Sequence, residues 1–287
     1  MLSGTSDIAK RYTTALEAIN EIACTYFFAG RFKDAVQTLR LSLELTEAQE
    51  VMPQSRLILL LLYGKVLLVE HLIRRNNPEL MFSVIQQAKA LAEEIQVPEY
   101  IADAVSLLGE ACCNATTMSI LESGNMPFGR QDKYHDALAY QQEALKLRET
   151  LHDSKGCSES HFLLGLIYQF WQQNELAREH FVTAIQIAED NGLVLEQAEP
   201  NRHLMFDARL QGDLDQALLY GERALFFRET GGFKPYQPLD HLALRDVYRQ
   251  KGDAEKAQFH ERQAMILAEE MGVAEHMTFV SASSERL

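Results

Sequence analysis

A forty-residue repeat is the feature that most restricts how this chain can fold. Alanine recurs with this period in two registers, at Ala137, Ala177, Ala217 and Ala257 and at Ala144, Ala184, Ala224 and Ala264. Glutamate recurs in a third register, at Glu149, Glu189, Glu229 and Glu269. A period held in three registers indicates copies of one supersecondary unit, which must stack on its neighbours to bury its apolar face.

Each copy is predicted to contain two helices joined by a short turn. Apolar residues recur at helical spacing in two runs per copy, and no run shows the alternation of a strand. The breaks between the runs read Gly30-Arg31, Gly212-Asp213 and Gly252-Asp253. Glycine can end a helix in a left-handed conformation, and aspartate can cap the next one. Gly109 and Gly165 lie within first helices, where glycine costs about 1 kcal/mol relative to alanine, which indicates close helix crossings.

The charge of the chain argues against two classes of partner. With 27 basic and 41 acidic residues the formal net charge is −14, and such a field repels nucleic acids and anionic membrane surfaces. The most apolar stretch, residues 57–69, spans 13 residues and contains Gly64 and Lys65, whereas a membrane span needs about 20. We therefore expect a buried core helix there, and no nucleic-acid or membrane partner. Residues 1–14 lack the pattern of a signal peptide.

Cysteine, histidine and motif content argues against a metal, a cofactor or catalysis. The four cysteines include no CxxC pair, so reduced thiols in a cytoplasmic compartment are expected at Cys24, Cys112, Cys113 and Cys157. The chain has no glycine-rich phosphate loop and no GxSxG or HExxH motif. A further forty-residue series is too widely spaced to share a metal ion and is predicted to form a structural ladder of Tyr140, His180, Tyr220 and His260.

The residues at these spacings resemble the tetratricopeptide repeat. The fullest match is Leu164-Gly165, Tyr168, Ala177, Phe181 and Ala184, with partial matches at Tyr26, Gly30 and Ala35 and at Tyr248, Gly252 and Ala257. The resemblance implies an all-α, right-handed superhelical solenoid of about six helix-turn-helix pairs. The usual period is about 34, and a lengthened period near 40 is similar to that of kinesin light chains and maltose-activator-type bacterial regulators. HEAT or armadillo repeats are the alternative fold.

The resemblance implies one domain over residues 1–287, with six repeats over about residues 16–272, a lead of residues 1–14 and a tail of residues 273–287. The repeats begin near Leu16, Leu57, Ala102, Ser158, Ala198 and Pro238. An insertion around residues 115–132 is turn-rich and is expected to be a disordered loop or a lid. Because no full capping helix follows the last repeat, we expect either the tail or a second copy, in a homodimer through the C-terminal repeat, to cover it.

The resemblance also implies a concave groove that is lined by the first helix of each repeat and binds another protein or peptide. The residues at the groove positions are Glu17, Asn20, Phe27, Lys65, Ser106, Glu110, Asn114, Phe162, Leu166, Gln169, Phe170, Arg202, Phe206, Arg209, Asp246 and Arg249. A clamp of lysine and asparagine residues binds chaperone tails in one subgroup of the family. That combination is missing from these positions, so a chaperone-tail partner is not expected.

Three arginines at groove positions suggest what is bound. Arg202, Phe206 and Arg209 lie at i, i+4 and i+7 on one helix face, and Arg249 takes the place of Arg209 one repeat later. Guanidinium groups in an acidic chain favour capture of a carboxylate or an acidic peptide. The other interpretation is that they pair with aspartate and glutamate of neighbouring helices.

Phe162, Leu166 and Phe170 form an apolar stripe beside the arginines, or else ordinary core between repeats. The function expected from these features is that of a protein–protein interaction scaffold, which holds a peptide or partner segment in the concave groove. The alternatives are a ligand-sensing regulatory module of a bacterial signalling or transcription system, and an enzyme with an unrecognised site.

Overall fold

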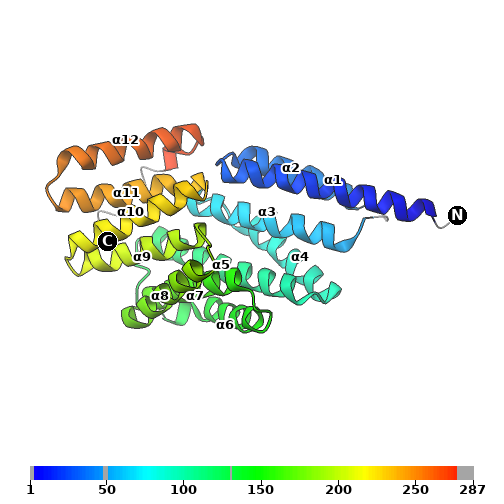
Figure 1. Cartoon of the computed structure of the whole chain (residues 1–287), viewed down its shortest axis with the longest axis horizontal. Coiled ribbons are helices and arrows are strands. Elements are labelled where there is room, and N and C mark those ends of the chain that lie inside the picture. Colours follow the sequence, from blue (N-terminus) through cyan, green and yellow to red (C-terminus); the bar gives the residue numbers. More distant parts are fainter. Residues whose placement is uncertain (1–2, 48–50, 130, 277–287) are drawn as a thin grey trace.

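The computed structural model describes residues 3–47, 51–129 and 131–276, and all regular structure within these ranges is helical (Figure 1). The helices are α1 (Ser3–Phe28), α2 (Phe32–Leu45), α3 (Pro53–Arg74), α4 (Glu79–Ile95), α5 (Pro98–Glu122), α6 (His135–Thr150), α7 (Ser154–Phe170), α8 (Asn174–Asp190), α9 (Ala198–Leu210), α10 (Leu214–Thr230), α11 (Gln237–Gln250) and α12 (Ala254–Glu270). Three short 3₁₀ helices are η1 (Gln131–Lys133), η2 (Leu195–Gln197) and η3 (Lys234–Tyr236).

Consecutive helices form six pairs, which confirms the all-α solenoid. The expected starts of repeats three to six fall within a few residues of the starts of α5, α7, α9 and α11. One boundary differs. Because α1 already begins at Ser3 and continues to Phe28, most of the segment expected as a lead of residues 1–14 is the first half of this helix.

The helix ends follow the predicted chemistry. Gly212 and Gly252 have positive φ values of 80° and 78° at the turns inside their pairs, which a residue without a Cβ adopts at little cost. The side chains of Asp213 and Asp253 then accept hydrogen bonds at 3.0 Å from backbone N–H groups of the first turns of α10 and α12. These local signals explain why the turns recur every forty residues.

Small residues allow the two helices of a pair to approach closely. All eight alanines of the two forty-residue registers are buried. A Cβ on Gly165 would lie 2.6 Å from Cε1 of Phe181 and 3.0 Å from the carbonyl oxygen of Ala177, and a Cβ on Gly109 would lie 2.8 Å from Nε2 of Gln141. The mid-helix glycines are therefore required by the crossings of α7 with α8 and α5 with α6.

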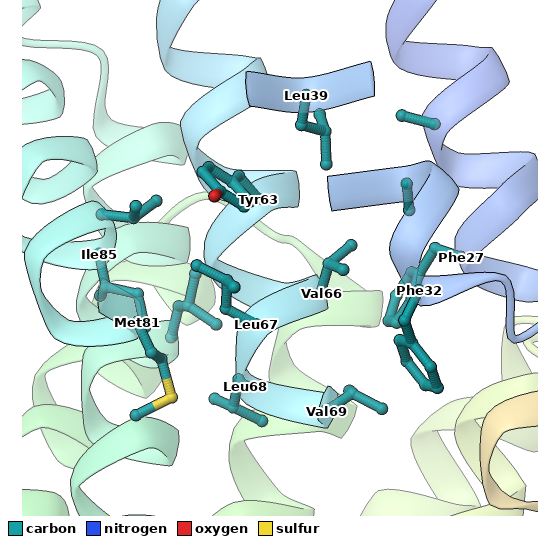
Figure 2. Packing of buried hydrophobic residues seen from close by; sticks show 14 of the residues in the cluster. Phe27, Phe32, Leu39, Tyr63, Val66, Leu67, Leu68, Val69, Met81 and Ile85 are labelled. Carbon is teal, nitrogen blue, oxygen red and sulfur yellow. The ribbon is translucent and has the colours of Figure 1, made fainter. Parts of the chain in front are cut away.

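α3 is the predicted core helix and lies between the first pair and α4. Figure 2 shows Val66 of α3 directed toward Phe32, and Leu67 directed toward Ile85 of α4. The second half of α3 is buried on most sides, as its continuous apolar run requires. α5 is long and apolar enough by composition to cross a membrane, yet 72% of that apolar window is buried inside the protein.

The last pair packs against the first, so the array closes on itself. The Phe233 ring, at the start of η3, meets Phe27 and Phe28 of α1 edge-on at 5.3 and 5.2 Å. The Met271 side chain occupies the space beside Gly30, where a Cβ would meet its sulfur at 2.4 Å. Figure 1 shows the end of α12 beside the turn between α1 and α2. Val273, the first residue of the expected tail, is fully buried in the same core, whereas residues 277–287 lie outside the described part of the chain.

The insertion around residues 115–132 packs onto the end of α7. Its first part continues α5 to Glu122, and the chain then returns so that the backbone N–H of Gly129 donates to the carbonyl of Phe170 at 2.7 Å. The buried Tyr134 ring stacks on Phe170 at 5.3 Å, and Phe128 lies 5.9 Å from the same ring. In its described part the insertion is thus a connection that packs on the predicted groove residue Phe170, and its role as a lid stays a prediction.

Candidate functional site

The first helices of the second, third and fourth pairs bring three charged residues together. The Nζ of Lys65 on α3 donates to Glu110 of α5 at 2.6 Å and to Glu159 of α7 at 3.3 Å. Although burial by itself would raise the pKa of the Glu159 carboxyl, Lys65 and Arg148 lower it to about 2. The predicted groove residue Lys65 is therefore the centre of an ion-pair network that joins three repeats.

Arg148, at the end of α6, joins this network through Glu159. It was not among the predicted groove residues. Its side chain is only 3% exposed and donates to Asp103 at 3.0 Å and to Glu159 at 2.8 Å. It also donates to the hydroxyls of Ser106 and Ser160. A buried guanidinium with this many acceptors fixes the relative positions of α5, α6 and α7.

Arg228 repeats this arrangement eighty residues later. Its side chain, 2% exposed, donates to Glu199 of α9 at 2.6 Å and to Asp240 of α11 at 2.9 Å, and its guanidinium lies 5.1 Å from the centre of the Tyr236 ring. The corresponding residues of the fourth and sixth pairs are Ala188 and Ala268. This alternation of arginine with alanine is the signal in the sequence from which the two buried cations could have been found.

The three predicted groove arginines all meet carboxylates. Arg202 donates to Glu199 at 2.6 Å, Arg249 donates to Glu261 at 3.0 Å, and Arg209 lies 3.7 Å from Asp246. Each of these arginines therefore has a carboxylate of the array as a neighbour, as the second interpretation expected. Asp246 is itself held at 2.6 Å by its neighbour Arg245.

The arginines differ in how fully they are paired. Arg209 is 7% exposed and reaches Asp246 only at 3.7 Å, which is beyond hydrogen-bonding distance. In the described ranges this guanidinium makes no hydrogen bond, and it lies 5.9 Å from the centre of the Phe206 ring. Arg202 lies at the same distance from this ring, so Phe206 is flanked by two guanidinium groups.

The remaining predicted residues divide between groove and core. Leu166 and Asn114 are buried. Phe162 packs against His203 at 5.5 Å, and Nδ1–H of the same histidine donates to Oε1 of Gln169 at 2.7 Å. Burial, together with Arg202, lowers the pKa of His203 to about 3, so this imidazole is neutral at physiological pH. Phe170 lies under the insertion, so the stripe that was predicted from Phe162, Leu166 and Phe170 belongs mostly to the core.

The predicted ladder on the second helices forms local pairs instead. Nδ1 of His180 lies 2.9 Å from Nδ1 of His161, and Nδ1 of His260 lies 2.9 Å from Nδ1 of His241. In each pair one ring must carry the proton and the other must present a bare nitrogen. Within the described ranges no group of three metal-binding side chains occurs, and the two pairs are eighty residues apart.

Comparisons with known proteins agree with this geometry. Two sequence profiles of the tetratricopeptide repeat match the chain, one over residues 128–190 and the other over residues 16–49. The first range covers α6, α7 and α8. The second range covers the second half of α1 and all of α2. The chain is a tetratricopeptide-repeat protein. Among proteins of curated function, none matches this tetratricopeptide-repeat protein by sequence.

Solved structures share the fold of this tetratricopeptide-repeat protein at low sequence identity. The Rap conjugation gene regulator of plasmid pLS20, in complex with the Phr* peptide, is similar with a TM-score of 0.64 and 16% identity, over 91% of this chain and 64% of that one. The apo form of RapI is similar with a TM-score of 0.61 and 12% identity, over 90% and 84% of the two chains. BtubC (BKLC) from P. vanneervenii is similar with a TM-score of 0.52 and 18% identity, over 90% and 92%.

Proposed function

We propose that this tetratricopeptide-repeat protein is an interaction scaffold that holds a peptide or a partner segment along its concave face, with an acidic group of the partner at Arg209. The observation that carries the proposal is the incomplete pairing of this arginine. Its guanidinium has five N–H donors, is nearly buried, and has one carboxylate at 3.7 Å. A guanidinium that makes no hydrogen bond to its own protein keeps donors for an incoming acceptor, so a carboxylate of the partner would complete its pairing.

The surface near Arg209 favours an extended peptide over a small metabolite. The depression between α7, α8 and α9, lined in part by Gln169, Arg178 and Asp207, has no room even for a water molecule, whereas small-molecule pockets usually measure about 300–1,000 Å³. A partner would therefore lie along the surface of the array and not inside a cavity. The aromatic ring of Phe206 beside Arg209 would contact an apolar neighbour of the acidic group.

A second proposed function is a regulatory module that senses a peptide. It is favoured by the similarity to the Rap regulator, which was solved with the Phr* peptide. Most charged residues of the site are held in ion pairs with one another, so we propose binding and not catalysis. We also propose a cytoplasmic location, because the four cysteines are free thiols.

A peptide library displayed on phage and selected on the immobilised full chain tests the proposal. We expect the selected peptides to share an acidic residue or a terminal carboxylate next to an apolar side chain. Their affinity, measured by fluorescence anisotropy, should fall at least tenfold in the Arg209→Gln variant and should weaken as salt is added.

The matched control is Arg262→Gln, which removes an exposed arginine from α12 and should leave the affinity unchanged. Circular dichroism would establish that both variants are folded. Peptides that bind Arg209→Gln and the wild type equally well would contradict the proposed role of Arg209. If only substitutions outside the concave face weakened peptide binding, the proposal that the groove is the binding site would be wrong.

A further inference from the structure

A cavity of about 190 Å³ lies where the two ends of the array meet. In the described part of the chain it is lined by Ile73, Arg74 and Arg75 at the end of α3 and by His276 beyond α12. Because a cavity needs only about 10–15 Å³ to hold one water molecule, this one has room for a small ligand. We call it the seam cavity.

The seam cavity exists because the array closes on itself. Nη2 of Arg74 donates to the carbonyl oxygen of Gly272 at 3.4 Å, and Val273 is fully buried in the core that the first pairs share. The end of α3 and the segment after α12 are therefore held beside each other, and each supplies part of the lining. A ligand in the cavity would contact both the second pair and the last.

Arg75 gives the seam cavity a cation that has no partner in the described ranges. Its side chain is partly buried and makes no hydrogen bond or ion pair there. The three residues that follow it, Asn76, Asn77 and Pro78, carry no charge. A guanidinium has five N–H donors, and an anion in the cavity would offer them acceptors.

The rest of the lining adds donors and no carboxylate among the described residues. Nε of Arg74 lies 3.2 Å from Oε1 of Glu70, so that carboxylate offsets the charge of Arg74 and leaves the charge of Arg75 in excess. The His276 side chain is partly buried and makes no hydrogen bond in the described part of the chain. Glu275 is exposed and does not line the cavity. Ile73, which is 2% exposed, supplies an apolar wall.

This lining suits a small oxyanion, and a phosphate group in particular. Arginine binds phosphate through two parallel N–H donors, and the several oxygens of a phosphate can accept from more than one of the lining residues at once. The net charge of −14 repels long polyanions. The volume is also below the roughly 300 Å³ at which pockets for larger small molecules begin.

We propose that the seam cavity binds a phosphate group, carried by inorganic phosphate or by a small phosphate monoester, between Arg75 of α3 and His276 beyond α12. The bound phosphate would connect the two ends of the array and would therefore stabilise its closure. The cavity is separate from Arg209 on the concave face, and the proposal does not depend on the proposed function.

Isothermal titration calorimetry of the full chain, in buffers of equal ionic strength, tests the proposal with inorganic phosphate, glycerol 3-phosphate and acetate. We expect both phosphate compounds to bind at least tenfold more tightly than acetate. Tighter binding of glycerol 3-phosphate would identify a monoester as the source of the group, and tighter binding of inorganic phosphate would identify the free ion. Arg75→Gln should weaken phosphate binding at least tenfold, and Arg75→Lys, which keeps the charge and loses the planar fork, should weaken it less.

The matched controls are Arg262→Gln on α12 and Arg209→Gln on the concave face, and both should bind phosphate as the wild type does. Circular dichroism would verify the fold of every variant. In hydrogen exchange, phosphate should protect backbone amides on both sides of the cavity, at the end of α3 and in residues 271–276. The proposal is overturned if neither phosphate compound binds, if acetate binds as tightly, if Arg75→Gln binds phosphate as the wild type does, or if protection appears on one side only.

Discussion

Replacing Phe233 with alanine should separate the two ends of the array. The side chain is 7% exposed and contacts two rings of α1, Phe27 at 5.3 Å and Phe28 at 5.2 Å. Removing a buried phenylalanine side chain costs about 3–5 kcal/mol. Edge-to-face aromatic pairs contribute about 0.5–1.5 kcal/mol each beyond their buried area, so the two pairs across the contact should account for about 1–3 kcal/mol of the loss.

Urea unfolding followed by circular dichroism measures the total loss, and a double-mutant cycle with Phe28→Ala isolates the Phe28–Phe233 pair, which should contribute about 0.5–1.5 kcal/mol. Hydrogen exchange should report faster opening of the second half of α1, although α1 is more than two hundred residues away in the chain. Phe226→Ala is the control, because it removes the same group from an exposed site and should change stability by less than about 0.5 kcal/mol. Additive effects of Phe233→Ala and Phe28→Ala, with unchanged protection of α1, would refute the closure of the array.

Three further predictions concern the pairs themselves. Gly165→Ala should lower the free energy of unfolding by about 1–3 kcal/mol in urea titrations despite the better helix propensity of alanine, because the new methyl group meets a buried ring and a backbone carbonyl; a stabilised variant would contradict the close crossing. Arg228→Met should cost about 3–5 kcal/mol in the same assay, because two carboxylates lose their cation, and a loss as small as that of Arg262→Met would contradict this role. Burial, and then the neighbouring His260, lower the pKa of His241 to about 4, below its unfolded value of about 6.5; because the unfolded state then binds more protons, stability should fall on the order of 1 kcal/mol as the pH drops from 7 to 5, and His241→Gln should show a shallower fall.

The order of the helix pairs and most of their starts could be predicted because their signals are local. The breaks at Gly212 and Gly252 act through their own backbone conformation and the adjacent aspartate caps. The need for Gly109 and Gly165 was likewise visible, since glycine in the middle of a helix lowers stability unless a neighbouring helix crosses there closely. These features depend on neighbours a few residues away, which the sequence displays directly.

The site was predicted less well because it depends on partners in other repeats. The position of Arg202 at the groove follows from its register, but its second carboxylate, Asp240 at 3.6 Å, comes from the next pair. The contact of Phe233 with α1 joins a loop to a helix two hundred residues away, and no local pattern indicates it. Arg148 and Arg228 alternate with Ala188 and Ala268 along the repeat, yet their acceptors come from the first helices of adjacent pairs.

The buried arginines and the histidine pairs each recur after eighty residues, and this spacing sets the size of the segment that could be exchanged between solenoids. Arg148 and Arg228 belong to the third and fifth pairs, whereas the histidine pairs, which include His180 and His260, belong to the fourth and sixth. Deleting one pair from the middle of the array would therefore bring together neighbours whose internal ion pairs do not match. Four helices, and not two, are the smallest module that could be removed, duplicated or grafted into another solenoid while every junction keeps its present neighbours.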